Sequence, residues 1–126
     1  MDAAELKRRI HAKEVVTGLQ QFSASPEIAE IAGFAGFDFV WFCIEHGTAY
    51  LGPELQNLIR AAEVGGAVPM VRITAIELPI IQRSLEQGAK GIIATRFKTP
   101  EDVRTAIAMT RYPEGSEGGL RGWCGS

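Results

Sequence analysis

Four apolar segments alternate with four helix-type segments along this 126-residue chain, and this alternation constrains the fold more than any other feature. The strand candidates are residues 15–22, 37–44, 67–73 and 90–97. The second of them is almost continuously apolar, which is typical of a strand buried on both faces in a parallel sheet. Strands that alternate with helices predict an α/β fold.

Helix starts with recognisable capping chemistry separate these strands. Three of them place a proline and then an acid in the first turn, and these are Ser25-Pro26-Glu27, Pro53-Glu54 and Thr99-Pro100-Glu101. Apolar residues at helical spacing mark a further helix around residues 78–85. Asp2 and Glu5 form a capping box that predicts a leading helix over residues 3–12.

The predicted order is a leading helix followed by four strand–helix units, with parallel strands joined by right-handed crossovers. A complete (β/α)8 TIM barrel takes about 250 residues, so four units in 126 residues correspond to half of one. An open four-stranded sheet with helices on both faces fits the same pattern. We expect residues 1–126 to form a single partial domain in which the Gly-rich residues 114–126 are a loop or tail.

The composition argues against several classes of function. The net charge is −2 and no basic cluster occurs, so we expect no nucleic-acid partner. The longest clean apolar run, residues 39–44, is far too short to span a membrane, and the charged residues 1–14 do not match a secretory signal. Cys43 and Cys124 make neither a disulfide framework nor a zinc motif, so we expect a cytoplasmic protein.

Polar side chains follow the second and third predicted strands, at the position where α/β folds place their active sites. Glu45 and His46 come directly after the second strand, and His is the usual general base near neutral pH. Arg72 lies near the end of the third strand, where a planar guanidinium can hold a carboxylate or a developing enolate. Both residues also have an interpretation without a catalytic role. His46 could be hydrogen-bonded to a backbone carbonyl, and Arg72 could pair with a nearby acid at the surface.

Three other polar residues have weaker claims. Arg96 follows the fourth strand as Arg72 follows the third, but pairing at the surface is the favoured interpretation there. Glu86 lies near the end of a helix that returns to the opposite face, so it can reach His46 only across a subunit contact. His11 is expected on the surface of the leading helix.

Taken together, a set of short motifs resembles the HpcH/HpaI aldolase family, the class II metal-dependent pyruvate aldolases. The resemblance runs from about Val16 onward, and the motifs occur in the order and near the spacing of that family. They are Ala35-Gly36-Phe37-Asp38-Phe39, Glu45-His46, Val71-Arg72, Leu85-Glu86-Gln87-Gly88-Ala89-Lys90-Gly91, Arg111-Tyr112-Pro113 and Leu120-Arg121-Gly122.

The resemblance implies a (β/α)8 barrel that cleaves 4-hydroxy-2-oxo acids to pyruvate and an aldehyde. It also implies a divalent metal ion, Mg²⁺, Mn²⁺ or Co²⁺, that acts as a Lewis acid on bound pyruvate. Within that family pattern, His46 matches the base and Arg72 matches the arginine that stabilises the enolate. Glu86 matches an acidic position that supports the catalytic His and is usually Asp.

Three departures from the family pattern stand out. Cys43 occupies the position of an Asp that commonly precedes the catalytic His by three residues, so His46 lacks an orienting carboxylate there. Thr95 replaces a usual Pro and is followed by Arg96. The family's metal ligands belong to the fifth and sixth strands, so the resemblance assigns no metal ligand to this chain.

Three interpretations follow. The first is the N-terminal half of an aldolase that takes a small oxo acid substrate and, by resemblance, assembles as a homo-oligomer. The second is a truncated, non-catalytic relative that survives as a self-associating half-barrel, because an unpaired edge strand and exposed apolar surface favour association. The third is a small flavodoxin-like domain, which the missing fifth strand and missing phosphate loop disfavour.

Overall fold

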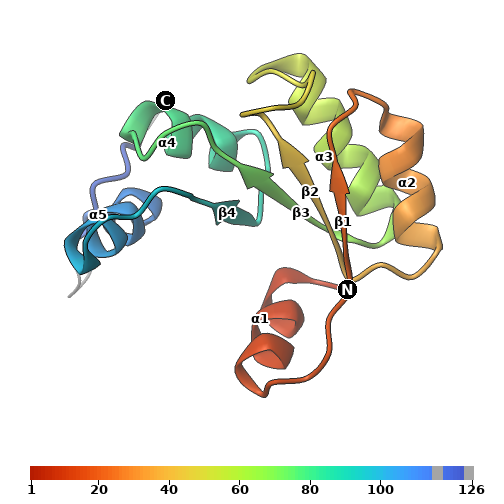
Figure 1. Ribbon diagram of the computed structural model, residues 1–126, viewed down its shortest axis with the longest axis horizontal. Coiled ribbons are helices and arrows are strands. Elements are labelled where there is room, and N and C mark those ends of the chain that lie inside the picture. Colours follow the sequence, from red (N-terminus) through yellow and green to blue (C-terminus); the bar gives the residue numbers. More distant parts are fainter. Residues whose placement is uncertain (115–117, 124–126) are drawn as a thin grey trace.

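The computed structural model describes residues 1–114 and 118–123. Five helices and four strands alternate in these ranges, and Figure 1 shows their arrangement. They are α1 (Ala3–His11), β1 (Gly18–Gln21), α2 (Pro26–Phe34), β2 (Phe39–Cys43), α3 (Pro53–Gly65), β3 (Val68–Arg72), α4 (Leu78–Glu86), β4 (Gly91–Ile93) and α5 (Pro100–Thr110). The predicted leading helix and four strand–helix units are confirmed.

The four strands form one parallel sheet in the order β1-β2-β3-β4. Each strand pairs with the strand that precedes it in the chain, so right-handed crossovers place every connecting helix on the same face. A sheet with helices on both faces would need the strand order to reverse at some point. The observed order therefore excludes that alternative and produces an arc of a barrel, with α1 at the N-terminal ends of the strands (Figure 1).

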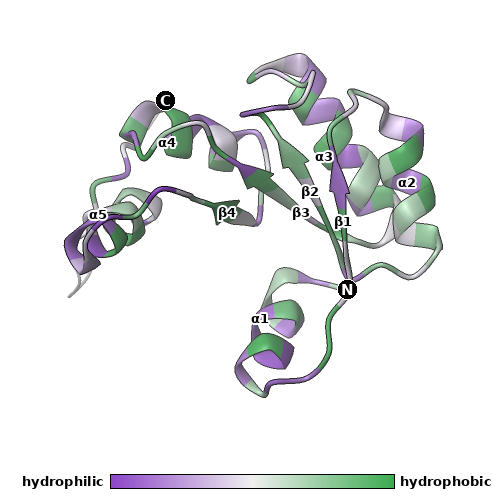
Figure 2. Cartoon of the chain, in the orientation of Figure 1, coloured by the Kyte–Doolittle hydropathy of each residue, from purple (hydrophilic) through white to green (hydrophobic). Residues whose placement is uncertain are grey.

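The core lies between the sheet and the helices that cover its outer face. Val40 and Phe42 of β2 are fully buried against Leu55 and Leu58 of α3. Because side chains alternate along a strand, Phe39 and Trp41 point to the other, concave face and are only partly buried. Figure 2 shows apolar residues along β2 and β3 and on the facing sides of the helices.

Both outer strands are shorter than the sequence pattern predicts. β1 covers Gly18–Gln21 instead of residues 15–22, and β4 covers Gly91–Ile93 instead of 90–97. Each of these strands has a partner on one side only within the described residues, so nothing holds its ends extended. Arg96 also adopts a left-handed backbone conformation (φ 67°), which ends the extended run after β4.

The predicted loop or tail over residues 114–126 lies partly outside the described residues, at 115–117 and 124–126. Its described part contacts α5 and α4. The backbone N–H of Leu120 donates to the carbonyl of Ala108, and that of Gly122 donates to Gln82 Oε1 at 3.0 Å. No helix in the described ranges is long and apolar enough to cross a membrane.

Asp38 joins α1 to the N-terminal ends of β1 and β2. Its Oδ1 lies 2.6 Å from Arg9 Nη1, and its Oδ2 accepts the backbone N–H of Thr17 at 2.7 Å. Only 13% of the Asp38 side chain is exposed, so solvent screens this pair weakly. The Thr17 N–H and the Arg9 guanidinium together hold the pKa of Asp38 below its ordinary value.

We expect Asp38→Asn to lower the free energy of unfolding at pH 7 by about 1.5–3 kcal/mol, because charge-assisted hydrogen bonds are lost. A folded-state pKa below the unfolded value stabilises the fold above about pH 4, and this contribution disappears as the pH falls through the folded pKa. Urea unfolding of both proteins should therefore show a difference that shrinks below about pH 4. Glu101→Gln, in an exposed pair with Arg104, is the control; an equal loss there would contradict the role of Asp38.

Candidate active site

Charged side chains from three consecutive units meet at the C-terminal edge of the sheet. Glu45 and His46 follow β2, Arg72 is the last residue of β3, and Arg96 follows β4 by three residues. Parallel strands point their C-terminal ends to the same edge, which is why side chains far apart in sequence gather here.

Glu45 is the centre of this cluster. Its Oε2 lies 2.9 Å from Arg72 Nη2 and 3.5 Å from His46 Nε2, and its Oε1 lies 2.5 Å from Arg96 Nη2. The sequence analysis favoured a surface pairing for Arg96, and the structure shows that exposed Arg96 pairs with Glu45, whose side chain is buried. The pairing spans 51 residues, so no local sequence pattern signals it.

The burial of Glu45 explains why it has two arginine partners. Only 5% of its side chain is exposed, compared with 22% for Arg72 and 71% for Arg96. An ion removed from water costs several kcal/mol unless opposite charges and hydrogen bonds compensate it. Two guanidinium groups supply the opposite charge, and that of Arg96 also donates a hydrogen bond to Oε1, so the edge carries a net positive charge after pairing.

Arg72 retains unused hydrogen-bonding capacity in this arrangement. Its Nε is buried and has no hydrogen-bond partner among the described residues. Its guanidinium carbon also lies 6.0 Å from the centroid of the Trp41 ring, at the outer limit of a cation–π contact. A buried donor without an acceptor is unfavourable, so an anionic or carbonyl oxygen is the expected partner.

A tight turn after β2 places His46. The backbone N–H of His46 donates to Cys43 Sγ at 3.3 Å, and the N–H of Gly47 donates to the Cys43 carbonyl at 3.0 Å. The N–H of Thr48 then donates to the carbonyl of Phe22 at 2.8 Å, which fixes the turn to the end of β1. Cys43 is thus fully buried and orients the His46 backbone through its sulfur, whereas 55% of the His46 side chain is exposed.

We expect Gly47→Ala to destabilise the protein by about 1–3 kcal/mol, because overpacking and backbone shifts have costs of this size. An added Cβ at Gly47 would collide with the carbonyl oxygens of Cys43 and Phe22. Thermal or urea unfolding measures the loss. Ser23→Ala, an exposed change near the same turn, should stay within about 0.5 kcal/mol. Equal stability of the two variants would show that the turn relaxes easily.

Glu86 lies apart from this cluster. It is the last residue of α4, and its Oε1 accepts the side-chain N–H of Gln82 at 2.9 Å. Helices of this fold run back toward the N-terminal edge of the sheet, which places the end of α4 away from His46. Among the described contacts, none joins Glu86 to His46, and its supporting role stays a prediction.

The described residues do not provide a metal site by themselves. They contain no group of three or more His, Cys, Asp and Glu side chains that could hold an ion. Glu45 is the carboxylate at the edge, and both of its oxygens are engaged by arginines. This donor set does not fit a resident divalent cation.

Comparison with known proteins places this geometry in a family. Residues 17–123 match the family model described as HpcH/HpaI aldolase/citrate lyase. The chain belongs to the HpcH/HpaI aldolase/citrate lyase family. The match includes β1–β4, α2–α5 and the whole Glu45 cluster.

Curated relatives in the HpcH/HpaI family are aldolases. The chain is 32% identical over 107 residues to a hydroxypyruvate/pyruvate aldolase of Cupriavidus necator. The aligned region covers 85% of this chain and 39% of the relative. It is 32% identical over 115 residues to a 5-keto-4-deoxy-D-glucarate aldolase of Salmonella paratyphi A, covering 90% of this chain and 44% of the relative.

Solved structures of the HpcH/HpaI family share the fold. A family protein from Burkholderia cenocepacia superposes with a TM-score of 0.86 at 30% identity, covering 96% of this chain and 48% of that chain. The citrate synthase SbnG gives a TM-score of 0.82 at 34% identity, covering 94% and 46%. This chain therefore spans less than half the length of these relatives, and the prediction of half a (β/α)8 barrel is confirmed.

Proposed function

We propose that this chain supplies the acid–base half of an aldolase that cleaves 4-hydroxy-2-oxo acids to pyruvate and an aldehyde, or runs the reverse condensation. The observation that carries this proposal is the Glu45 cluster, which sets an exposed imidazole beside an arginine with an unpartnered buried donor. Relatives named as aldolases of hydroxypyruvate and pyruvate and of 5-keto-4-deoxy-D-glucarate support the reaction type.

In this proposal each residue has a defined task. His46 accepts the proton of the substrate's 4-hydroxyl, directly or through water, as the C3–C4 bond breaks and the aldehyde leaves. The electron pair of that bond passes to the 2-oxo oxygen, and Arg72 stabilises the resulting enolate. A proton then returns to C3 and gives pyruvate. Glu45 acts on both residues, since it holds Arg72 and lies within reach of the His46 imidazole.

Two expectations from the family resemblance extend this proposal. The described donor set does not fit a metal ion, and the family resemblance implies that the ligands for Mg²⁺, Mn²⁺ or Co²⁺ belong to the fifth and sixth strands of the barrel. Glu86 would support a catalytic histidine only across a subunit contact, which requires the homo-oligomer that the family resemblance implies.

A chimera tests the proposal directly. This chain would be joined to the C-terminal half of the Cupriavidus necator hydroxypyruvate/pyruvate aldolase, and pyruvate release from a 4-hydroxy-2-oxo acid would be measured with each of the three cations. We expect activity in the chimera and none in the 126-residue chain alone. A folded but inactive chimera would contradict the proposed function, and activity of the isolated chain would contradict the assignment of the metal ligands elsewhere.

A further inference from the structure

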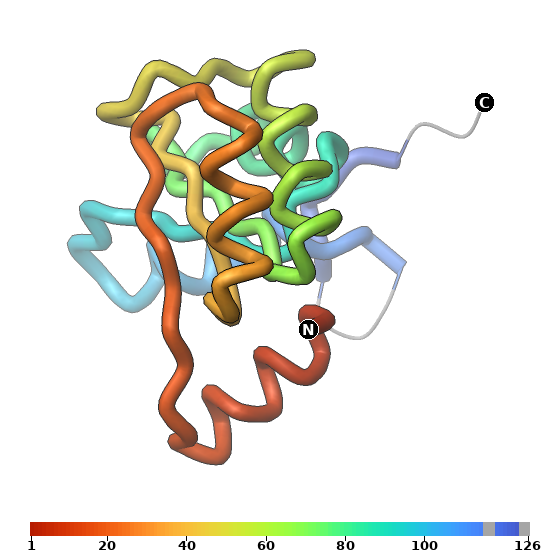
Figure 3. The backbone as a smooth tube through the Cα atoms, turned by 90° about the vertical axis from the view of Figure 1, so that its right-hand side faces the viewer, coloured from red at the N-terminus to blue at the C-terminus, as the bar shows by residue number. Residues whose placement is uncertain are grey.

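The Glu45 carboxylate, at the end of the strands opposite α1 (Figure 3), is held by a hydrogen bond from Arg96. Arg96 Nη2 donates to Oε1 of Glu45 at 2.5 Å. The other oxygen, Oε2, lies 2.9 Å from Arg72 Nη2 and 3.5 Å from His46 Nε2. Among the described residues, however, Oε2 has no hydrogen-bond partner. Its contact with Arg72 is therefore an ion pair that leaves a buried acceptor unused.

The orientation of the Glu45 carboxylate depends on such a donor. The last torsion of a Glu side chain has a broad distribution, so rotamer preference alone does not fix where the two oxygens point. Only 5% of the Glu45 side chain is exposed, so bulk water does little to hold it. The hydrogen bond from Arg96 to Oε1 therefore decides whether Oε2 stays directed at Arg72 and His46.

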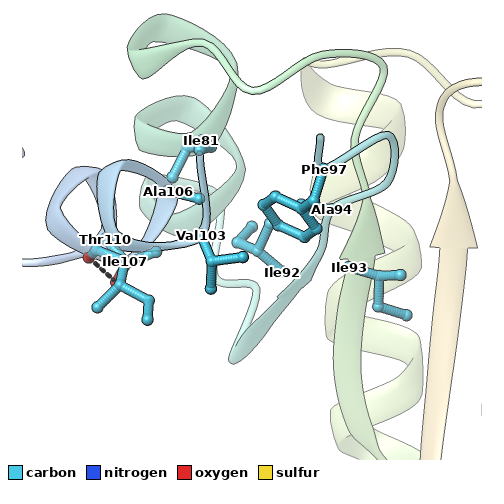
Figure 4. Close-up of a pocket in the computed structure, with 9 residues that line it drawn as sticks. All are labelled: Ile81, Ile92, Ile93, Ala94, Phe97, Val103, Ala106, Ile107 and Thr110. Carbon is cyan, nitrogen blue, oxygen red and sulfur yellow. Dashed lines mark hydrogen bonds between the residues drawn. The ribbon is translucent and has the colours of Figure 1, made fainter. Parts of the chain in front are cut away.

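The backbone at Arg96 is held in an unusual conformation. Its φ of 67° lies in the left-handed region, which residues other than glycine rarely adopt and which persists where the surrounding structure holds it. Before Arg96, the carbonyl of Ile93 accepts the N–H of Ile73 at 3.1 Å. After it, Phe97 lines the apolar pocket between β4 and α5 (Figure 4). The strained position is thus the one whose side chain reaches Glu45.

We propose that Arg96 is a positioning residue of the proposed aldolase site and that it acts through Glu45. By holding Oε1, it keeps Oε2 directed at His46 and Arg72. Oε2 then accepts a hydrogen bond from the His46 ring as substrate binds, because catalytic hydrogen bonds are often long in the unliganded state and shorten in the complex. The carboxylate thereby orients the imidazole. This inference rests on the proposed function, since it concerns the proposed base.

Kinetics of the chimera test this role. Arg96→Met removes the donors and the charge, and we expect kcat to fall about 10–100-fold with little change in KM, as the loss of an orienting partner does at metal-bound histidines. Arg96→Lys keeps a charged donor for the single bond to Oε1 and should recover most of that loss. Arg104→Met, the same change in an exposed pair on α5, should leave kcat unchanged. A parent-like kcat in Arg96→Met would overturn the proposal.

The alternative role for Arg96 is a direct contact with substrate, because its side chain is 71% exposed. A Glu45→Gln background distinguishes the two roles. A residue that acts through the carboxylate has no further effect once that carboxylate is an amide, so Arg96→Met should lower kcat no further there. An undiminished fall in kcat in the Glu45→Gln background would show that Arg96 acts on substrate directly and would overturn the positioning role.

The ring resonances of the two histidines test the contact without turnover. In the 126-residue chain with isotope-labelled histidine, Arg96→Met should shift the ring nitrogens of His46. Those of His11, on α1 at the other end of the strands, should stay in place. An unchanged His46 spectrum would overturn the proposal even where the parent chimera is active. An inactive parent chimera would contradict the proposed function instead, and the spectra would still show whether Arg96 positions the carboxylate.

Discussion

Replacing His46 by Ala in the chimera is expected to lower kcat for pyruvate release by about 10²–10⁴-fold, the usual contribution of a positioned general acid–base group. The side chain is more than half exposed, so the change removes the imidazole with little effect on packing. The turn that carries it depends on backbone bonds to Cys43 and Phe22, which alanine leaves intact. A steady-state assay at saturating substrate measures the effect.

His11→Ala provides the matched control, because it makes the same substitution at an exposed position on α1. It should leave kcat unchanged. If His46→Ala retains the parent kcat while unfolding at the same temperature as the chimera, His46 is not the base and the proton passes to another group.

Replacing Arg72 by Lys in the same chimera is expected to lower kcat by about 10²–10³-fold, as the loss of one enolate-stabilising donor does in comparable sites. Lysine keeps the charge, so Glu45 remains paired. It loses the planar guanidinium, whose Nε is the buried donor without a partner and which lies over Trp41. The substitution therefore tests the hydrogen-bond geometry of the Arg72 side chain while its positive charge stays the same.

Arg104→Lys, in an exposed pair on α5, controls for the substitution itself. It should leave kcat within the error of the assay. An Arg72→Lys chimera that keeps its kcat but has a higher KM would indicate that Arg72 binds the substrate and the transition state equally and does not stabilise the enolate selectively.

The sequence predicted the architecture well because its local signals agree with the fold. The capping residue Thr99 accepts the N–H of Asp102 in a complete capping box, and Pro53 begins α3 as expected. The buried segment predicted at residues 37–44 contains β2, which pairs with β1 on one side and β3 on the other. These features depend on neighbours within a few residues, which a sequence pattern captures directly.

The parts that sequence reasoning missed depend on contacts between distant segments. The strand predicted over residues 90–97 is shorter in the structure because β4 has a partner on one side only among the described residues. This depends on the whole sheet and not on the residues of that segment. A pairing of Arg96 with an acid was expected, but its partner Glu45 was not, because the two residues belong to different strand–helix units and lie 51 residues apart. Charge compensation around a buried carboxylate becomes evident only once the strands are side by side.

The link between Asp38 and Arg9 lies at the N-terminal edge of the sheet, opposite the Glu45 cluster. Substitutions that strengthen or weaken the attachment of α1 therefore act a strand's length away from the proposed catalytic residues. Substitutions at the N-terminal ends of the strands can change stability, while substitutions at the C-terminal ends can change substrate preference in the proposed enzyme. Substitutions in α1 and its contacts could thus raise the melting temperature without altering the proposed catalytic residues.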